Sequence, residues 1–522
     1  MKTRRLTRSL IAGAVASAAV AVSIIVITTA TAATTRFEAE SATISQGAVN
    51  SDHTGFTGSG FVNYDNVAGS FVEFTVPSTT AKRVTLIFRY ANGSASNRPM
   101  DITVNGALVS DDLPFDTTGS WTTWRTQSIT AMLDATDNKI RATATVAAGG
   151  PNLDSLTVDD GIVPTTDWSV AVVNSTMARF TPGTLGGWSY TRGLYLWGQY
   201  LVYKRTGNPA YLTYIKNWAD RFVHSDGSID QSFNNLDSMQ SGNVLIALFR
   251  ETGQSKYRTA ANKIRNRLNT YPRTRDGGWW HANSDSRRNQ LWGDGVFMVL
   301  PFLARYGQTF GDSDGFASRE TARQLEVYFS HLRDNGLNLL RHAYNQDKDT
   351  SWADPVTGQS PIPWCRAMGW FGMATIEVLE ILPATHPRRQ ALIDIIRFLA
   401  VGWERNQDPL SGRWFQVVNR GDRSDNWTET SCSSMYTYVL SRGVERSYID
   451  AHYRDVAAKG WRGVLQRISK GSDGRTNLTE ICIGTNVGDS YAFYRDRPRA
   501  TNDFHGLGAF LIMQEQMMRV GA

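Results

Sequence analysis

The sequence predicts a multidomain chain, with a β-sandwich of the jelly-roll type followed by an all-α (α/α)6 toroid. From Arg36 to about Asp160, short runs such as SFVEFTV and RVTLIFRY alternate apolar and polar residues, as half-buried strands do. After Trp168 the apolar residues recur with helical spacing instead. We therefore expect the sandwich over residues 36–160, a linker over residues 161–168 and the helical domain over residues 169–522.

The first residues have the composition of a secretory signal peptide. Basic residues lead into a long apolar run that ends at Ala30, Thr31 and Ala32, in the small-x-small form of a cleavage site. We expect residues 1–32 to be removed and the mature protein to be secreted and extracellular, by the general or the twin-arginine route. Since no second apolar run is long enough to span a bilayer, no membrane partner is expected.

Charge is divided unevenly between the two expected domains. Residues 33–165 hold 8 basic and 14 acidic residues, whereas the rest of the mature chain is net positive. An acidic sandwich suits a cation, and a basic helical domain suits an anionic substrate. The chain has no Lys/Arg run and no basic helix, which argues against a nucleic-acid partner.

The toroid is predicted from repeated helix–turn–helix units. The turn of the first unit recurs about 46 residues later in the second, from Thr206 to Thr252. Units of roughly that length fit about seven times into the remaining chain. That number favours a closed ring of helical hairpins, with a funnel at its axis, over an open bundle.

Tryptophan and cysteine give two further expectations. Of the 16 tryptophans 14 follow the sandwich, and several stand in Gly-rich loops, where aromatic faces commonly stack on sugar rings. As a set they favour a carbohydrate ligand, although any single one is more often core filling. Three cysteines leave at least one thiol free, and we expect Cys432 to pair with Cys482 because Cys365 lies in an apolar-aromatic stretch.

A single carboxylate stands out in the stretch from Arg288 to Met298. Asp294 lies there among apolar and aromatic residues, where a helix is expected to begin. Burial among such neighbours raises a carboxyl pKa, so we expect Asp294 to hold its proton near neutral pH, as a general acid must. The alternative is that Asp294 only caps the helix that follows it.

Five stretches carry the unusual residues: Arg288 to Met298, NNLDSMQSG around Asp237, RHAYNQ around His342, Trp352 to Trp370, and Gly484 to Leu511. Together they strongly resemble glycoside hydrolase family 105, the unsaturated rhamnogalacturonyl hydrolases and their relatives, and the resemblance extends from Trp188 to the end of the chain. Its most specific motifs are WxDG at Trp292 to Gly295, WxRxxGW at Trp364 to Trp370 and NDxHGxG at Asn502 to Gly508. The resemblance implies a six-hairpin toroid. It also implies an enzyme that acts on acidic oligosaccharides left by polysaccharide lyases, whose terminal sugar has a C4–C5 double bond.

In that chemistry one carboxyl group protonates C4, water captures C5, and the hydrated sugar opens and expels the aglycone, with no cofactor. By resemblance Asp294 is the acid/base, and Asp237 holds a sugar hydroxyl or raises the pKa of Asp294, unless it caps a helix. His342 would hydrogen-bond the sugar or the water, and Arg366 would bind the substrate carboxylate or form an interhelical ion pair. Trp292 and Trp370 are expected to form walls of the substrate pocket. His281 is expected to bind substrate as well.

The sugar preference stays open between two acidic substrates. The rhamnogalacturonyl members place a Lys after the histidine that matches His281, and Ala282 stands there in this chain. A rhamnogalacturonan or pectin fragment and an unsaturated glucuronyl substrate from ulvan-like polysaccharides are therefore both candidates. Other classes are an ordinary inverting glycosidase, with Asp237 as its second carboxylate, and a non-catalytic sugar-binding protein.

The sandwich resembles a carbohydrate-binding module of family 35, or the similar family 6, in the runs FEAESA, TGSGFV, TGSWTTW and PNLDSLTV. By that resemblance Glu38, Glu40 and Asp154 hold a structural calcium ion, a cation that prefers carboxylate oxygen. Trp121 and Asn152 are the implied sugar contacts. A plant or algal polysaccharide is the partner expected for this module.

Overall fold

The computed structural model describes residues 34–79, 81–159 and 166–520. The chain divides into two compact units between Ile162 and Val163. The expected signal peptide, residues 1–32, and most of the expected linker lie outside the described residues. Helix α1 (Trp168–Arg179) begins at the last residue of that linker. In the described part of the chain, no helix is long and apolar enough to cross a membrane.

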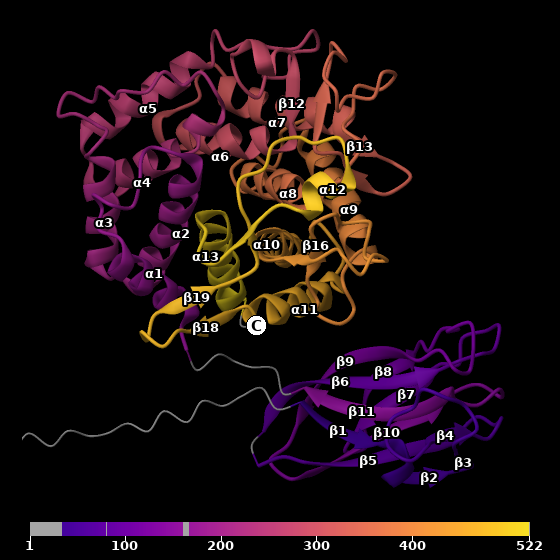
Figure 1. The fold of residues 1–522 in the computed structure, drawn as a ribbon. Helices are drawn as coiled ribbons and strands as arrows, with labels where there is room; N and C mark the ends of the chain where they lie inside the picture. The colour runs from indigo at the N-terminus through magenta and orange to yellow at the C-terminus, as the bar shows by residue number, and fades with distance from the viewer. Residues whose placement is uncertain (1–33, 80, 160–165, 521–522) are drawn as a thin grey trace, which may run out of the picture. The chain divides into compact units, whose positions relative to one another are not determined.

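The N-terminal unit is a sandwich of two antiparallel sheets, as the alternating pattern predicts (Figure 1). The first sheet contains β3 (Gly47–Asn50), β4 (Phe61–Tyr64), β11 (Asn152–Asp159), β6 (Lys82–Ala91) and β9 (Arg125–Leu133) in that order, with β1 (Thr34–Glu38) also paired to β11. The second contains β2 (Thr43–Ser45), β5 (Phe71–Pro77), β10 (Asp137–Ala144), β7 (Met100–Val104) and β8 (Ala107–Leu113). Alternate side chains enter a shared core: Val72, Phe74 and Val76 of β5 are buried.

The C-terminal unit is an (α/α)6 toroid in which six helices form an inner ring within the described residues (Figure 1). The inner helices are α2 (Tyr190–Thr206), α4 (Gly242–Thr252), α6 (Gly293–Phe310), α8 (Cys365–Leu379), α10 (Thr430–Glu445) and α13 (Phe504–Arg519). Outside them lie α1, α3 (Pro209–Ala219), α5 (Ser255–Arg267), α7 (Phe316–Leu332), α9 (Arg389–Arg405) and α11 (Tyr453–Leu465). Each inner helix packs on the next, and α13 packs on α2. The ring is therefore closed by helices from opposite ends of the domain.

The closure between α2 and α13 depends on two glycines. A Cβ at Gly198 of α2 would lie 2.7 Å from the Cβ of Leu511, and one at Gly508 of α13 would lie 2.5 Å from Cγ of Leu194. Both approaches are closer than carbon atoms tolerate, so the two helices reach their contact distance because neither residue has a side chain. Gly508 is the last residue of the NDxHGxG motif, which thereby acquires a packing role.

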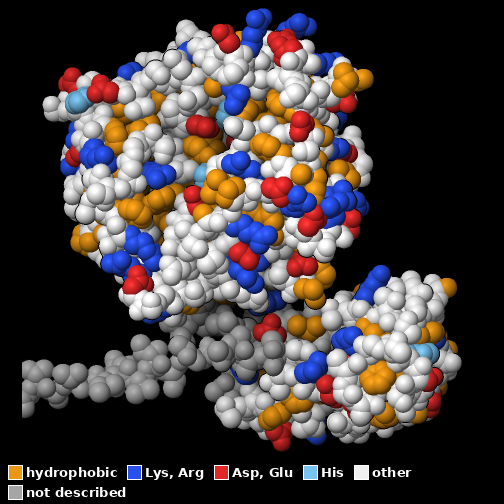
Figure 2. Space-filling view, viewed as in Figure 1, with side chains coloured by type: hydrophobic (Ala, Val, Ile, Leu, Met, Phe, Trp, Pro, Cys, Tyr) orange, Lys and Arg blue, Asp and Glu red, His pale blue; other side chains and the backbone are white. Residues whose placement is uncertain are grey.

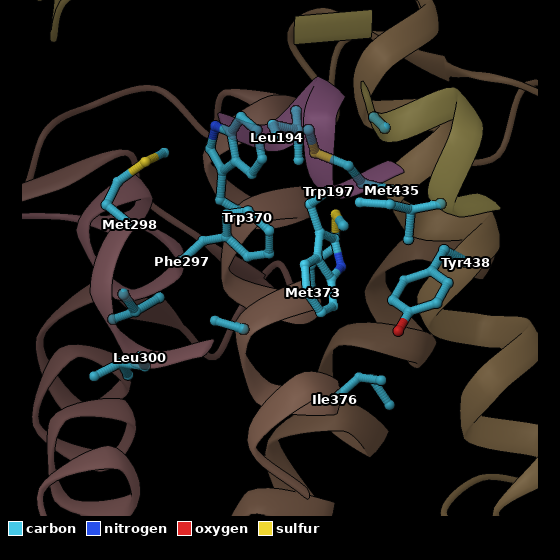
Figure 3. Close-up of a cluster of buried hydrophobic side chains, with 14 of the residues drawn as sticks. Leu194, Trp197, Phe297, Met298, Leu300, Trp370, Met373, Ile376, Met435 and Tyr438 are labelled. Atoms are coloured by element: carbon cyan, nitrogen blue, oxygen red, sulfur yellow. The ribbon is translucent and has the colours of Figure 1, made fainter. Parts of the chain in front are cut away.

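Between the inner helices, large apolar side chains pack into a buried cluster (Figure 3). Several of the loop tryptophans that the sequence offered as sugar contacts belong to buried clusters instead: Trp279, Trp364 and Trp414 are at most 1% exposed, and Trp427 is 5% exposed. For these four the core-filling alternative is correct. The indole is large enough to be buried from a loop as well as from a helix.

The disulfide differs from the expected pairing. Cys365 begins α8, Cys432 lies in the first turn of the adjacent α10, and the two are bonded with a Cα–Cα distance of 5.7 Å. Cys482, the partner predicted for Cys432, is a buried free thiol. The prediction was wrong because the register of two neighbouring helices, which the sequence does not reveal, places Cys365 opposite Cys432. The expectation that at least one thiol stays free is confirmed.

Candidate active site

A pocket of about 400 Å³ collects residues from distant parts of the helical unit, a size that suits a small ligand. Its walls come from the start of α2, from the loops after α3 and α5, from the first turns of α6, and from the segment that follows β20 (Ile481–Cys482). Acidic and histidine side chains are visible toward the middle of this unit, over α6 (Figure 2). The lining residues are Tyr190, Asn235, Asp237, His281, Ala282, Arg287, Trp292, Asp294, Met298, Gly484, Thr485 and Asn486.

A short two-stranded sheet places Asp294 against His342. Strand β12 (Gln290–Trp292) pairs with β15 (Ala343–Asn345), and the amide of Gly293 donates to the carbonyl of His342 at 2.8 Å. Asp294 then faces the imidazole, with its Oδ2 3.1 Å from His342 Nε2. The N-cap of α6 is Trp292, so Asp294 is not the helix cap that the sequence left as its alternative role.

His342 contacts Asp294 from outside the pocket. The amide of Gly488 donates to the Tyr494 hydroxyl oxygen, at 3.0 Å, and that hydroxyl lies 2.8 Å from His342 Nδ1. An ionised carboxylate can only accept, so His342 donates to Asp294 from Nε2, and the Tyr494 hydroxyl holds the other ring nitrogen. His342 is fully buried and does not line the pocket. It therefore orients a carboxylate, whereas the sequence expected it to contact the sugar or the water.

The pKa of Asp294 shifts in the direction opposite to the sequence prediction. Burial raises this pKa, but the hydrogen bond and charge of His342, together with His281, outweigh burial and lower it below its usual value. Asp294 is therefore ionised at neutral pH in the free protein. The prediction of a retained proton was wrong because the apolar neighbours along the sequence reveal desolvation but not a histidine that approaches from another strand.

Asp237 has the opposite shift in the same pocket. It begins a single 3₁₀ turn, Asp237–Met239, and does not cap α4, whose N-cap is Ser241. Burial raises its pKa and the charge of Asp294 raises it further, while His281 and Arg287 oppose the rise. About a third of the side chain still faces the pocket. Filling the pocket would remove the remaining water and strengthen the rise.

The expected residues His281 and Trp292 both line the pocket and pack on each other. Their rings stack with centroids 4.3 Å apart and an interplanar angle of 8°. His281 Nε2 lies 3.8 Å from Oδ1 of Asp237. Burial lowers the pKa of His281, which keeps its ring neutral near pH 7 in spite of the two carboxylates nearby.

Arg366 and Trp370 lie outside the pocket. The Arg366 side chain is 1% exposed, and its guanidinium donates to the backbone carbonyls of Cys482, at 2.5 Å, and Ile483, at 2.7 Å. Trp370 is also 1% exposed and stacks on Phe297 in the core at 4.8 Å (Figure 3). Arg366 thus anchors the C-terminal segment and does not reach the pocket to bind a substrate carboxylate, as the sequence had led us to expect. Trp370 packs in the core and does not form the expected pocket wall.

Two of the three acidic residues expected to hold calcium, Glu38 and Asp154, meet at Thr57 in the sandwich, and Glu40 lies beside Ser59. The Thr57 hydroxyl donates toward Glu38 Oε2 and Asp154 Oδ2, each at 2.8 Å, and Ser59 N donates to Glu40 Oε1 at 2.6 Å. Arg89 pairs with Asp154, at 2.5 Å, and neutralises part of the charge. Oε2 of Glu40 is buried with no hydrogen-bond donor among the described residues. The orphaned oxygen and the oxygen-only donor set suit a hard cation. Among the described residues the three carboxylates do not yet converge on one point, so a cation would have to draw them together.

The two sugar contacts expected in the sandwich have different surroundings. Trp121 is partly exposed, and the Cζ of Arg98 lies 5.2 Å from its ring. The ring of His53 is nearly parallel to that of Trp121, with centroids 6.4 Å apart. Asn152 is only 3% exposed at the start of β11, which leaves little of it for a direct sugar contact. Its side chain is buried because it stands in the central strand of a sheet.

Comparison with known families decides the identity of both units. The model of glycosyl hydrolase family 88 matches residues 168–520. The chain belongs to glycosyl hydrolase family 88. The model of carbohydrate-binding module family 35 matches residues 45–158. The protein is therefore a glycoside hydrolase that carries a family 35 module, and of the two module families the sequence allowed, family 35 is the one that matches.

Individual relatives agree with this division. A family 105 glycoside hydrolase of C. acetobutylicum ATCC 824 is 34% identical, with a TM-score of 0.65, over 68% of this chain and all of that one. A possible family 105 member from Klebsiella pneumoniae, 22% identical with a TM-score of 0.60, shows the same fold. An exo-β-D-glucosaminidase of Amycolatopsis orientalis is 51% identical over 122 residues. That match covers 23% of this chain and 12% of the length of the glucosaminidase.

The family 88 domain also uses residues that the sequence did not single out. His505, from the NDxHGxG motif, links Asp503 to Tyr190: its Nδ1 lies 2.5 Å from Asp503 Oδ1 and its Nε2 lies 2.6 Å from the Tyr190 hydroxyl. Burial raises the pKa of Asp503, but His505 outweighs burial and lowers it, so the carboxylate is ionised and Nδ1 donates to it. Burial lowers the pKa of His505, so its ring is neutral and Nε2 accepts from the Tyr190 hydroxyl. The motif was the one available signal for this arrangement.

His342 is expected to set the protonation of Asp294. Burial raises the pKa of Asp294, and replacing His342 by Ala removes the donor that outweighs burial, so that pKa should rise. The ¹³C chemical shift of the Asp294 carboxyl, followed over a pH titration, measures the change. Substituting Phe for Tyr494 should give a smaller rise, because the imidazole stays in place. An unchanged Asp294 titration in the Ala variant would contradict this account.

Proposed function

We propose that this family 88 enzyme removes the 4,5-unsaturated uronyl residue from the non-reducing end of lyase-generated acidic oligosaccharides. One observation carries the proposal: two carboxyl groups, the partly exposed Asp237 and the largely buried Asp294, line one sugar-sized pocket, and their pKa values are pushed in opposite directions. Such a pair supplies an acid and a base at the same pH. The family 105 motifs and the family 105 structural relative support the unsaturated substrate.

The charge states of the free protein divide the chemistry between the two groups. Asp237, with the raised pKa, delivers its proton to C4, and positive charge develops at C5 and the ring oxygen. Asp294, held ionised by His342, takes a proton from the water that adds to C5. The resulting hemiketal opens at its C5–O5 bond, and the hemiacetal left at C1 releases the aglycone. One water is consumed, and both carboxyl groups return to their starting states by proton exchange.

The substrate class and cellular setting complete the proposal. Rhamnogalacturonan or pectin fragments are the first candidates, and ulvan-like glucuronyl fragments are the second, since Ala282 stands beside His281 in the pocket wall. The predicted signal peptide supports secretion. The family 35 module is proposed to bind a plant or algal polysaccharide through the surface around Trp121, with Glu38, Glu40 and Asp154 as the ligands of a structural calcium ion.

Loss of ultraviolet absorbance from the unsaturated uronyl group is the direct test. Wild-type protein should bleach this absorbance in pectin-lyase or ulvan-lyase digests, and the digest that responds identifies the substrate class. Substituting Asn for Asp294 should reduce turnover at least 100-fold and leave oligosaccharide binding largely intact. The same change at the exposed Asp285 serves as the control. New reducing ends with unchanged absorbance would instead indicate an ordinary inverting glycosidase. Oligosaccharide binding with neither a loss of absorbance nor new reducing ends would indicate a sugar-binding protein.

The division of roles predicts a bell-shaped dependence of kcat/KM on pH. Activity should fall as the pH drops through the lowered pKa of Asp294, because the base becomes protonated. It should also fall as the pH rises through the raised pKa of Asp237, because the acid loses its proton. Replacing Asp237 by Asn should leave a weak residual activity without the alkaline limb, whereas replacing the exposed Asp230 should change nothing. An alkaline limb that persists without Asp237 would assign the acid to Asp294.

Calcium removal tests the metal proposed for the module. Chelation by EDTA should lower the melting temperature of the sandwich, because Glu38, Glu40 and Asp154 would then repel one another without a cation. Differential scanning calorimetry with calcium added back measures the effect. The transition of the helical unit should not move. A sandwich transition that is indifferent to both EDTA and calcium would contradict the metal site.

A further inference from the structure

The active-site pocket has one cationic side chain among its described lining residues, and it is Arg287. The sequence had assigned the substrate carboxylate to Arg366, whose guanidinium is committed to two backbone carbonyls behind the pocket wall. An anionic substrate that enters the pocket meets at least one ionised carboxylate, Asp294. Without a cation in contact with it, such a substrate would be repelled and poorly solvated.

Arg287 is held in place without an ion pair among the described residues. Its Cζ lies 4.6 Å from the ring centroid of Trp292, the indole that forms part of the pocket wall. Nη1 donates to the carbonyl of Ser286 at 3.0 Å, and Nη2 points to Asn486 Oδ1 at 3.5 Å. No carboxylate lies within ion-pair distance of this guanidinium among the described residues. Its stacking contact orients the planar fork, and several of its five N–H donors remain for a ligand.

The electrostatics of the wall agree with this geometry. The side chain of Arg287 is half-buried. Burial lowers the pKa of its guanidinium and the charge of Asp237 raises it, but the group stays protonated at any physiological pH. A half-buried cation that is not yet paired attracts an anion more strongly than a fully hydrated one does, because less water screens it.

We propose that Arg287 is the specificity residue that binds the carboxylate of the uronyl group being removed. The inference rests on the proposed function and deepens it, because it names the group that makes an acidic sugar the preferred substrate. The planar guanidinium matches a carboxylate with two parallel hydrogen bonds. Stacking on Trp292 fixes the fork before the sugar arrives, so little side-chain entropy is lost on binding.

The neighbouring residue offers a matched control. Arg288 is adjacent in the chain and has the same side chain, yet it is 67% exposed and lies 3.9 Å from Asp347. It does not line the pocket. Replacing either arginine by Met removes one positive charge and keeps a long apolar side chain, so only the position of the charge differs between the two variants.

The experiment compares two substrates in both variants. The first carries the unsaturated uronyl residue on a neutral 4-nitrophenyl aglycone, and the second is its methyl ester. The Arg287→Met variant should lose about 10- to 100-fold in kcat/KM on the acid, mainly through KM, as for one charge-assisted contact. On the ester it should match the wild type within about twofold. Lys at position 287 should restore part of the loss, and Arg288→Met should resemble the wild type on both substrates.

Each other result overturns the assignment. Equal losses of kcat/KM on the acid and the ester would show that Arg287 only supports Trp292. No loss on either substrate would show that Arg287 does not bind the substrate carboxylate. If the wild type bleaches no unsaturated substrate, the proposed function fails instead. Calorimetric binding of galacturonate against its methyl ester then still decides whether Arg287→Met abolishes the preference for the acid.

Discussion

The pocket depends on the attachment of the C-terminal segment to the inner ring by two buried residues of opposite charge. Arg366 of α8 donates to the carbonyls of Cys482 and Ile483, and Glu429 accepts the amide of Cys482 at 2.8 Å. Neither side chain is more than 1% exposed, so each would be costly to bury without these partners. The segment they hold then supplies the far wall of the pocket and the hydroxyl of Tyr494.

This attachment also sets the charge of the site. Tyr494 is hydrogen-bonded to His342, and His342 in turn lowers the pKa of Asp294 and keeps it ionised. Asp237 has no such donor, so burial and the charge of Asp294 raise its pKa. The proposed acid and base are thus two chemically identical side chains whose roles follow from which of them receives a hydrogen bond. Tyr494, in the C-terminal segment, thus acts through His342 on the protonation of Asp294 in α6.

The sequence predicted the fold well because the fold follows from local patterns. Alternation with a period of two marks the strands of the sandwich, and helical spacing with a recurrent turn marks the hairpins of the toroid. The predicted six-hairpin ring is confirmed by the six inner helices of the described residues. A unit of 46 residues would fit about seven times, and the ring has six because some connections are longer, such as the one from Leu332 to Cys365.

The sequence by itself determined the two-domain architecture and the identity of Asp237, Asp294, His281 and Trp292 as pocket residues, since short motifs carry them. Only the tertiary structure decided that Arg366 is an anchor, that Trp370 is core and that Cys432 bonds Cys365. It also decided that Asp294 is ionised and that Arg287 lies at the pocket. The physical reason is common to all of these. A motif fixes which side chain is present, but its pKa, its partners and its exposure are set by groups that reach it from distant parts of the chain.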